Sequence, residues 1–326
     1  MSNTVTWPHR MLSGAAKVFT AGALTGAAAT AFGLISARQF SIRTLEIPIL
    51  PPGHQPLRIL HIGDMHVVTG DRRKIEFVRS LADLKPDLVI NTGDNPGGAN
   101  AIDDVVAALE PLVEIPGVIV PGSNDLYGPR AANPLRYLRA PSNLDDSESQ
   151  QERIDTRALF DRLLAPGGWH LIANRALNMS IRDDLLLRFA GTHDAHMHAD
   201  VWPGFHPAAV AADALATNAA ELRVAVTHAP YRRVLDAAVA DGADLVFAGH
   251  THGGQVALPA YGAIVSNCDL PTGLASGLFP WRAAGRTGLV HVTAGIGASP
   301  TVPLRTFCTP EVSLMELMAA QPGSQH

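Results

Sequence analysis

Two histidines one residue apart follow an apolar run in the C-terminal half of the chain. His250 and His252 lie in the segment AGHTHGGQV, just past the end of the strand-like run of residues 244–248. In a strand, residues i and i+2 point to the same face, so the two imidazoles can converge on one point. Neutral imidazole is a common metal ligand, and Gly253 and Gly254 would allow a sharp turn beside a bound group. The pair predicts either a metal site or a turn with solvent-exposed histidines.

Four other apolar runs also end in side chains that can bind a metal ion. They cover residues 57–66, 87–95, 117–125 and 222–230, and their last residues include Asp64, His66, Asp94, Asn95, Asn124, Asp125 and His228. Helical patterns lie between the runs, at residues 71–84, 101–114 and 231–240. Strands that alternate with helices predict a largely parallel sheet, and the carboxyl ends of its strands meet at one edge. Core packing does not account for five such endings, so we expect a shared metal site.

The order and spacing of these groups resemble the signature of the calcineurin-like metallophosphoesterases. That signature reads Asp-x-His, Gly-Asp, Gly-Asn-His-Asp/Glu, a single His and Gly-His-x-His, and its counterparts here extend from residue 57 to about residue 256. The ending GHTHGGQ is similar to that of the membrane-associated bacterial branch. The resemblance implies an α/β fold, the αββα sandwich, in which two mixed β-sheets flanked by helices pack face to face. It also implies a dinuclear metal site at one edge.

The resemblance assigns most of the metal ligands. It implies that Asp94 bridges two ions, with the other ligands divided between the first ion (Asp64, His66, His252) and the second (His228, His250). Carboxylate oxygens mixed with imidazoles suit Mn²⁺, Fe or Zn²⁺. Two such ions about 3.5–4 Å apart can acidify a bridging water and bind both the attacking and the leaving oxygen at phosphorus. The implied reaction is hydrolysis of a phosphate ester by a metal-bridging hydroxide, without a covalent enzyme intermediate.

The third motif departs from the family pattern, because it reads Gly-Ser-Asn-Asp. Aligned without a gap, Ser123 replaces the amide ligand and Asn124 replaces the histidine that serves as general acid. Shifted by one residue, Asn124 is the ligand and Asp125 takes the place of the acid. We favour the shifted alignment, because an amide oxygen binds a cation better than a neutral hydroxyl does. Either alignment lacks the motif histidine, and losing a general acid typically costs about 10²–10⁴ in rate.

A histidine-rich stretch offers a substitute for the missing proton donor. Residues 190–206 follow an apolar strand and contain four of the chain's 14 histidines (His193, His196, His198, His206). We select His196 as a catalytic residue and Asp194 as a substrate contact, against the alternative of a polar surface loop. The segment HMHAD also resembles the metal motif of metallo-β-lactamase-like hydrolases, but Val201 stands where that motif has its last histidine.

Two further residues are candidates for binding the substrate. Asn95 directly follows Asp94, and Arg130 lies in a polar, turn-rich segment, residues 128–168, that we interpret as an insertion. An arginine near a phosphoryl site can bind two phosphate oxygens at once. The alternative for this segment is an ordinary solvated loop.

The N-terminal part of the sequence predicts an anchor. Residues 18–35 carry no charge, and a membrane-spanning helix needs about 17–25 apolar residues. We expect a single-pass signal anchor within residues 1–44. The alternatives are a signal peptide that is cleaved to release a secreted protein, and a helix that packs on the protein itself. We interpret the remainder as a Pro-rich connector (45–56), the metallophosphoesterase domain (57–320) and a tail (321–326).

Composition narrows the range of partners and cofactors. The chain has 25 basic and 30 acidic residues and a net charge of −5, with no basic stripe, so nucleic-acid binding is not expected. Cys268 and Cys308 are too few for a disulfide scaffold, and we favour two free thiols over a bridge. Three other histidines are interpreted as core residues (His61, His170, His291).

The missing motif histidine bears on the substrate. Phosphodiesters and pyrophosphates with stabilised leaving groups need less acid assistance than unactivated phosphomonoesters, so we expect a phosphodiester or a pyrophosphate. An anchor would favour a lipid-linked phosphate. The alternatives are a phosphomonoesterase and a catalytically weak, metal-binding interaction module of the same fold.

Overall fold

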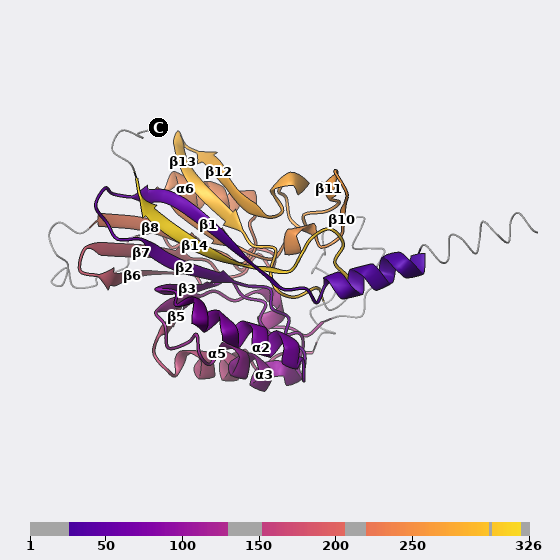
Figure 1. Ribbon diagram of the computed structural model, residues 1–326. Helices are drawn as coiled ribbons and strands as arrows, with labels where there is room; N and C mark the ends of the chain where they lie inside the picture. Colours follow the sequence, from indigo (N-terminus) through magenta and orange to yellow (C-terminus); the bar gives the residue numbers. More distant parts are fainter. Residues whose placement is uncertain (1–25, 130–151, 206–219, 300–301, 321–326) are drawn as a thin grey trace, which may run out of the picture.

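Two six-stranded β-sheets lie face to face, with helices on both outer faces (Figure 1). The structure is a computed structural model and describes residues 26–129, 152–205, 220–299 and 302–320. Both sheets are mixed, with parallel strands in the middle and an antiparallel pairing towards one or both edges.

The first sheet has the strand order β1-β14-β2-β3-β4-β5. Strands β2 to β5 run parallel, β14 is antiparallel to β2, and the edge strand β1 pairs in parallel with β14. The bounds are β1 (Ser41–Leu50), β2 (Leu57–Ile62), β3 (Leu88–Asn91), β4 (Gly117–Ile119), β5 (Trp169–Leu171) and β14 (Glu311–Ala319). The carboxyl ends of β2, β3 and β4 therefore lie side by side at one edge.

The second sheet has the order β12-β13-β9-β8-β7-β6. Its four central strands run parallel, and the edge strands β6 and β12 are antiparallel to their neighbours. The bounds are β6 (Arg175–Arg182), β7 (Leu185–Gly191), β8 (Ala220–Val226), β9 (Leu245–Ala248), β12 (Gly277–Ala283) and β13 (Arg286–Val292). A two-stranded hairpin, β10 (Ala257–Leu258) and β11 (Gly262–Ala263), follows β9.

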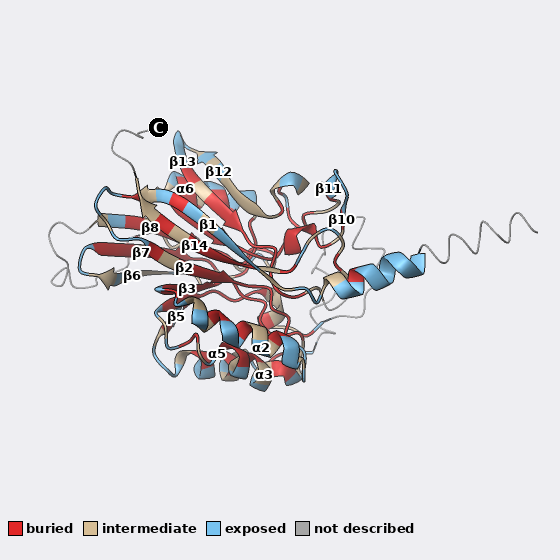
Figure 2. Ribbon diagram, in the orientation of Figure 1, coloured by how far each residue is buried: buried red, intermediate tan, exposed pale blue. Residues whose placement is uncertain are grey.

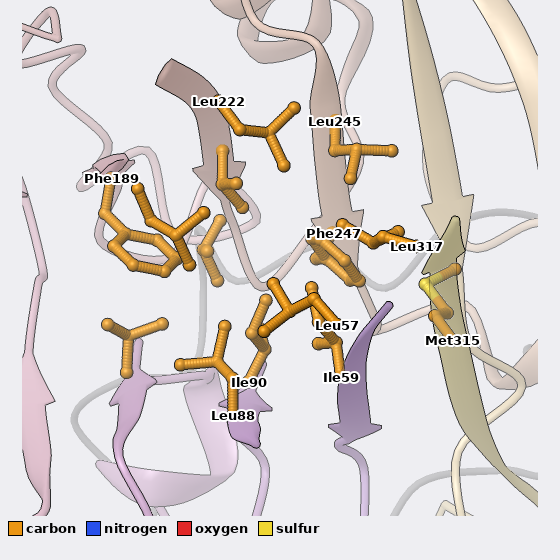
Figure 3. Close-up of a cluster of buried hydrophobic side chains, with 14 of the residues drawn as sticks. Leu57, Ile59, Leu88, Ile90, Phe189, Leu222, Leu245, Phe247, Met315 and Leu317 are labelled. Atoms are coloured by element: carbon orange, nitrogen blue, oxygen red, sulfur yellow. The ribbon is translucent and has the colours of Figure 1, made fainter. Parts of the chain in front are cut away.

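Apolar side chains from both sheets fill the space between them (Figure 3). Strand β2 shows how the sequence produces this layer, because its side chains alternate between two faces. Leu57 and Ile59 contact the second sheet's residues, whereas Leu60 and Ile62 belong to the cluster beneath the helices. A strand that is buried on both faces is expected to be largely apolar; β9 (LVFA) is apolar throughout, whereas β2 and β3 also carry His61 and Asn91, which are buried.

Helices cover both outer faces. The helices α2 (Arg72–Ser80), α3 (Ile102–Leu109) and α5 (Thr156–Leu164) pack on the first sheet, and α6 (Arg232–Ala240) packs on the second. Each of these helices buries one side and exposes the other (Figure 2). Short 3₁₀ turns complete the connections: η1 (Leu81–Leu84), η2 (Ala99–Ala101), η3 (Ser123–Asp125), η6 (His252–Gly254) and η7 (Thr272–Leu274). The expected αββα sandwich is confirmed, with helices where the sequence pattern placed them.

The first sheet includes residues that precede residue 57, the predicted start of the metallophosphoesterase domain. Residues 45–50, expected to form part of a connector, are the second half of β1, which pairs with β14 along nearly its whole length. Within the predicted insertion 128–168, the helix α5 contributes buried residues to the helical layer. Residues 130–151, and with them Arg130, lie outside the described residues, as do 206–219 and the predicted tail.

The anchor region is described only in part. A helix over residues 26–36 extends from the body of the molecule, at the right of Figure 1. Among the helices of the described residues, none is both long enough and apolar enough to cross a membrane. The predicted span also includes residues 18–25, which lie outside the described part. The anchor therefore stays a prediction.

The prediction that three histidines are core residues is correct for two of them. His61 and His291 are fully buried, and their Nδ1 atoms are 2.8 Å apart across the interface between the sheets. The interpretation is wrong for His170, which is exposed on the edge strand β5. Cys268 and Cys308 are both free thiols.

Candidate metal centre

Five of the candidate ligands follow the ends of three strands with an unusual backbone conformation. Asp64 and His66 follow β2, Asp94 follows β3, and His250 and His252 follow β9. All five have positive φ, between 42° and 68°. Non-glycine residues rarely adopt this left-handed region, and such residues concentrate at functional sites. The backbone thus turns each of these side chains out of the regular strand direction at one edge of the sandwich.

Four of these residues form a compact group with metal-binding capacity. Asp64, His66, Asp94 and His252 are all buried, and they offer ligand atoms that lie within 4.8 Å of one another. The Nε2 atoms of His66 and His252 are 3.1 Å apart. His66 Nε2 lies 3.5 Å from Asp94 Oδ2, and His252 Nε2 lies 3.9 Å from Asp64 Oδ1. Two carboxylates and two imidazoles could together hold one divalent ion here.

A second group of side chains also lies against Asp94. His228 Nε2 lies 3.6 Å from Asp94 Oδ2 and 3.2 Å from His250 Nδ1. Asn124, in η3, donates from its side-chain amide to Asp94 Oδ2 at 2.7 Å and from its backbone amide to Asp94 Oδ1 at 2.8 Å. The carboxylate of Asp94 therefore contacts residues of both groups, as a bridging ligand must.

Main-chain carbonyls orient three of the imidazole rings. His228 Nδ1 lies 2.7 Å from the carbonyl oxygen of Thr92, His250 Nε2 lies 3.1 Å from that of Asn267, and His252 Nδ1 lies 3.2 Å from that of Gly297. A carbonyl oxygen only accepts, so a hydrogen bond to it requires a proton on the ring nitrogen. At His252 and His250 the same nitrogen also lies 3.3 Å from a donor, the Arg305 guanidinium and the Asn267 side-chain amide respectively. The other nitrogen of each ring then presents its lone pair to the cluster, which is the arrangement found around metal-bound histidines.

The charges of the cluster also suit divalent cations. Burial raises the pKa of Asp64 to about 7 and of Asp194 to about 6. Burial alone would lower the pKa of His228, but the carboxylates of Asp94, Asp194 and Asp64 raise it to about 9. These raised pKa values reflect several carboxyl groups buried close together, and a cation bound here would favour their ionised form and would take the place of the second proton on His228.

Glycines allow the loops to approach these carboxylates closely. A Cβ atom at Gly249 would lie 2.5 Å from Asp64 Oδ2, and one at Gly122 would overlap Asp94 Oδ1. Distances this short leave no room for any side chain at either position. The two motif glycines are thus required by packing against the ligands, not only by the turns that they form.

Asp125 and Asn95 lie behind Asp94. Asp125 Oδ2 accepts from the backbone amides of Asp94 and Gly122, both at 2.8 Å. Its Oδ1 accepts from the backbone and side-chain amides of Asn95, both at 3.0 Å, and Asn91 donates to Asn95 Oδ1 at 2.8 Å. These contacts suit support of the Asp94 loop better than the proton transfer and substrate contact that the sequence suggested for Asp125 and Asn95.

The histidine-rich stretch comes next to the second group. Asp194 is fully buried, its Oδ1 accepts from the backbone amide of His196 at 2.8 Å, and its Oδ2 has no hydrogen-bond partner among the described residues. The His196 ring lies 4.5 Å from the His250 ring, centroid to centroid, and its Nδ1 lies 2.9 Å from the Tyr231 hydroxyl. A polar surface loop would leave Asp194 and His196 exposed, and both are buried.

The alternative metal site in HMHAD finds no support in the part of the chain that the structure describes. The only metal-competent cluster found there combines residues from the ends of β2, β3 and β9, and none from residues 196–200. Sequence reasoning also missed three residues that contact the candidate site. These are Tyr231, Lys74, whose Nζ donates to the His66 carbonyl at 2.9 Å, and Arg305, which contacts His252.

Comparisons with known proteins agree with this geometry. A model of the calcineurin-like phosphoesterase family matches residues 57–254. The uncharacterized metallophosphoesterase YkuE of Bacillus subtilis (strain 168) is 24% identical over 286 residues, which are 84% of this chain and 83% of YkuE. The uncharacterized protein YpbG of the same organism is 26% identical over 299 residues, 89% of this chain and 97% of YpbG.

A solved structure is also similar. The crystal structure of TT1561 of Thermus thermophilus covers 74% of this chain and 91% of its own, at 14% identity and a TM-score of 0.36. The family match spans more than half of the chain and includes every ligand of the metal-competent cluster. The protein belongs to the calcineurin-like phosphoesterase family.

Proposed function

We propose that the protein is a dinuclear metal-dependent phosphoesterase that hydrolyses a phosphodiester or a pyrophosphate. The observation that carries this proposal is the position of Asp94, whose carboxylate contacts two separate groups of nitrogen and oxygen ligands. Two divalent ions bound there, Mn, Fe or Zn, would supply Lewis acidity that activates water and stabilises charge on the phosphoryl oxygens.

Each side chain of the site then has a defined task. Asp64, His66 and His252 would form the first metal position, and Asn124, His228 and His250 the second, with Asp94 common to both. The carbonyl oxygens behind the rings hold three of the histidines in the tautomer that binds a cation. The fixed ring orientations reduce the reorganisation that binding requires.

His196 is our candidate for delivering a proton to the leaving group. Burial lowers the pKa of its ring to about 4, so near neutral pH only the minor protonated form can do so. It lies against the His250 ring, and the Tyr231 hydroxyl at its Nδ1 fixes the orientation of its ring. The third motif lacks the histidine that relatives place there, so proton delivery has to come from another element. Asp194 holds the backbone of this loop through the amide of His196.

The missing motif histidine also favours a phosphodiester or a pyrophosphate as the substrate. A phosphodiester or pyrophosphate with a good leaving group tolerates weak acid assistance, whereas an unactivated phosphomonoester does not. A phosphomonoesterase remains the second candidate within the same chemistry. A catalytically weak interaction module is the candidate of another class, although a module would have no need for the complete set of ligands.

We further infer that the protein is attached to a membrane through residues 18–35. The described end of this segment, the helix over residues 26–36, exposes Phe32, Leu34 and Ile35. An attached enzyme would act on lipid-linked phosphates. The substitutions Leu24→Arg and Ala28→Arg, each costing about 3 kcal/mol in a bilayer, should move the full chain from membrane vesicles to the soluble fraction in a flotation experiment. If the wild-type chain does not float with the vesicles, the attachment is wrong.

Hydrolysis of bis-p-nitrophenyl phosphate tests the catalytic proposal. Turnover by the full chain should require Mn²⁺, Fe²⁺ or Zn²⁺ and should be lost in Asp94→Asn, because the amide cannot serve both metal positions as an anion. Asp83→Asn, at an exposed aspartate of η1, is the matched control and should retain full activity. Absence of metal-dependent turnover would favour the interaction module. A higher rate on p-nitrophenyl phosphate than on the diester would favour the phosphomonoesterase.

A further inference from the structure

Arg305 is a fully buried arginine at the base of the first metal position. It lies in the loop before β14, outside every recognised motif. Arginine keeps its charge in proteins, and burial of that charge is costly unless hydrogen bonds replace its water. A buried guanidinium at this place therefore calls for a specific role.

The guanidinium of Arg305 gathers main-chain carbonyls from two loops. Its Nε donates to the Gly297 carbonyl at 3.0 Å, and its Nη2 donates to those of Ala294 and Gly295 at 2.6 and 3.1 Å. Its Nη1 donates to the carbonyl of His252 at 3.3 Å. One rigid, planar group thus connects the segment after β13 to the loop that carries His252.

The segment after β13 supports two ligands of the first position. The Gly297 amide donates to the Asp64 carbonyl at 2.6 Å, and a Cβ at Gly295 would lie 2.5 Å from Asp64 Cβ, so this segment packs directly on Asp64. The Gly297 carbonyl also faces His252 Nδ1 at 3.2 Å. The carbonyl that faces the His252 ring is therefore itself oriented by Arg305, whose Nη2 also lies 3.3 Å from His252 Nδ1.

The second group is oriented from other elements. The carbonyls behind His228 and His250 belong to Thr92, after β3, and to Asn267, in the loop after β11. A loss of Arg305 should therefore act unequally on the two metal positions.

We propose that Arg305 is a positioning residue for the first metal position. It fixes the distance between Asp64 and His252 by holding residues 294–297 against both, and it fixes the His252 ring through the Gly297 carbonyl. This inference rests on the dinuclear site of the proposed function. It assigns to Arg305 a selective effect on one of the two metal ions, which a general stabilising role would not produce.

Calorimetric titration of the metal-free, full-length protein with Mn²⁺ tests the proposal. The wild type should show two classes of sites. His252→Ala and His228→Ala should each remove one class and so identify the first and second positions. The class of sites that is lost in His252→Ala is the first position. Arg305→Met should weaken Mn²⁺ binding to this class by about 10–100-fold, the usual cost of losing a partner that orients a ligand. The class that His228→Ala removes should stay unchanged.

Two further variants complete the experiment. Arg305→Lys keeps the charge but not the planar guanidinium, so it should weaken Mn²⁺ binding at the first position less than Arg305→Met does. If Arg305→Met does not fold, Arg305→Lys tests the proposal in its place, because it too should weaken the first position and leave the second unchanged. Arg305→Met combined with His252→Ala should bind Mn²⁺ as His252→Ala alone does, because both changes act on one position.

Different results of this titration would overturn the positioning role and the proposed function. Equal weakening of both classes by Arg305→Met and Arg305→Lys, or no weakening of either class, would overturn the positioning role while leaving the dinuclear site intact. A wild-type protein that binds no Mn²⁺, Fe²⁺ or Zn²⁺ would instead overturn the proposed function.

Discussion

The protein itself orients the histidines of the candidate metal centre. Carbonyl oxygens hold His228, His250 and His252 with one ring nitrogen turned towards the cluster. His66 differs, because its Nδ1 is buried with no hydrogen-bond partner among the described residues. Its neighbours restrain it instead, with His252 stacked on its ring at 4.9 Å. The site therefore combines three fixed ligands with one that is held by packing.

The role of His196 gives a prediction about leaving groups. His196→Ala should lower the rate on diesters with poor leaving groups, such as alkyl esters, by about 10²–10⁴-fold, because these need a proton donor. The rate on bis-p-nitrophenyl phosphate should change much less, since p-nitrophenolate leaves without protonation. Tyr231→Phe should show a smaller effect of the same kind, because it removes only the group that orients His196. Initial rates on both ester types measure the effect. Equal losses of rate on both types would contradict the role of His196 as proton donor.

Sequence spacing selected the candidate ligands but not the residues that support them. Asp64-x-His66 and His250-x-His252 are local patterns with a geometric meaning that needs no partner. Arg305 acts through backbone carbonyls, which every residue has, so no pattern of side chains marks it. Asp125 shows the same limit, because a carboxylate in a motif does not reveal whether it faces the substrate or the backbone amides.

Strand β1 shows why one element was misread. The stretch LEIPILPP contains three prolines, which are typical of a stiff connector. Proline is tolerated on an edge strand, where one side of the backbone has no partner strand, and β1 is the edge of the first sheet. Its partner β14 lies about 270 residues further along the chain, since Ser41 pairs with Glu311. No local feature of the sequence reports such a pairing.

The histidine bridge between β2 and β13 predicts a dependence of stability on pH. Burial first, and then the charge of Arg43, lowers the pKa of His291 to about 3, whereas an unfolded histidine titrates near 6.5. The stabilisation that depends on neutral His291 is thus complete above pH 6.5 and is lost as the pH falls towards 3. Within this range its contribution to the unfolding free energy falls by about 1.4 kcal/mol per pH unit. His291→Gln should flatten the fall of the unfolding free energy between pH 6 and 4.

Denaturant unfolding at several pH values provides the measurement for His291. His170→Gln is the control, because His170 is exposed on β5 and its replacement should leave the slope unchanged. The buried carboxyl groups of the metal centre titrate in the same range with the opposite sign, but they are common to all variants and cancel in the comparison. Identical slopes for His291→Gln and the wild type would show that the bridge does not govern acid stability.

The helix over residues 26–36 gives a prediction about docking. A Cβ at Gly33 would lie 3.3 Å from Leu304 Cβ, and the Gly33 carbonyl accepts from the Arg305 amide at 3.0 Å, so the helix packs closely on the Arg305 loop. Gly33→Leu should lower the unfolding free energy by about 1–3 kcal/mol through overpacking. Gly26→Leu is matched on the same helix, with nothing within 4 Å of its Cβ. It should be neutral or slightly stabilising in thermal unfolding, and equal effects would argue against docking.

At the scale of the whole molecule, the metal centre lies where the two sheets meet. The first sheet contributes Asp64, His66 and Asp94, and the second contributes His228, His250 and His252. Each sheet alone therefore holds only part of the ligand set. Any ion that binds both parts also links the two layers of the sandwich, so metal binding and folding must be thermodynamically coupled.

This coupling predicts the effect of metal removal on stability. An ion that binds only the folded state raises the unfolding free energy by about 2.7 kcal/mol at one hundred times its Kd. Removal of the ions with a chelator should therefore lower the Tm of the wild type, and Mn²⁺ should restore it. Asp94→Asn should melt at the same temperature with and without Mn²⁺, because Asp94 is a ligand of both proposed metal positions. A wild-type Tm that does not respond to Mn²⁺, Fe²⁺ or Zn²⁺ would mean that the sheets are not joined by metal, and differential scanning calorimetry of the full chain decides this.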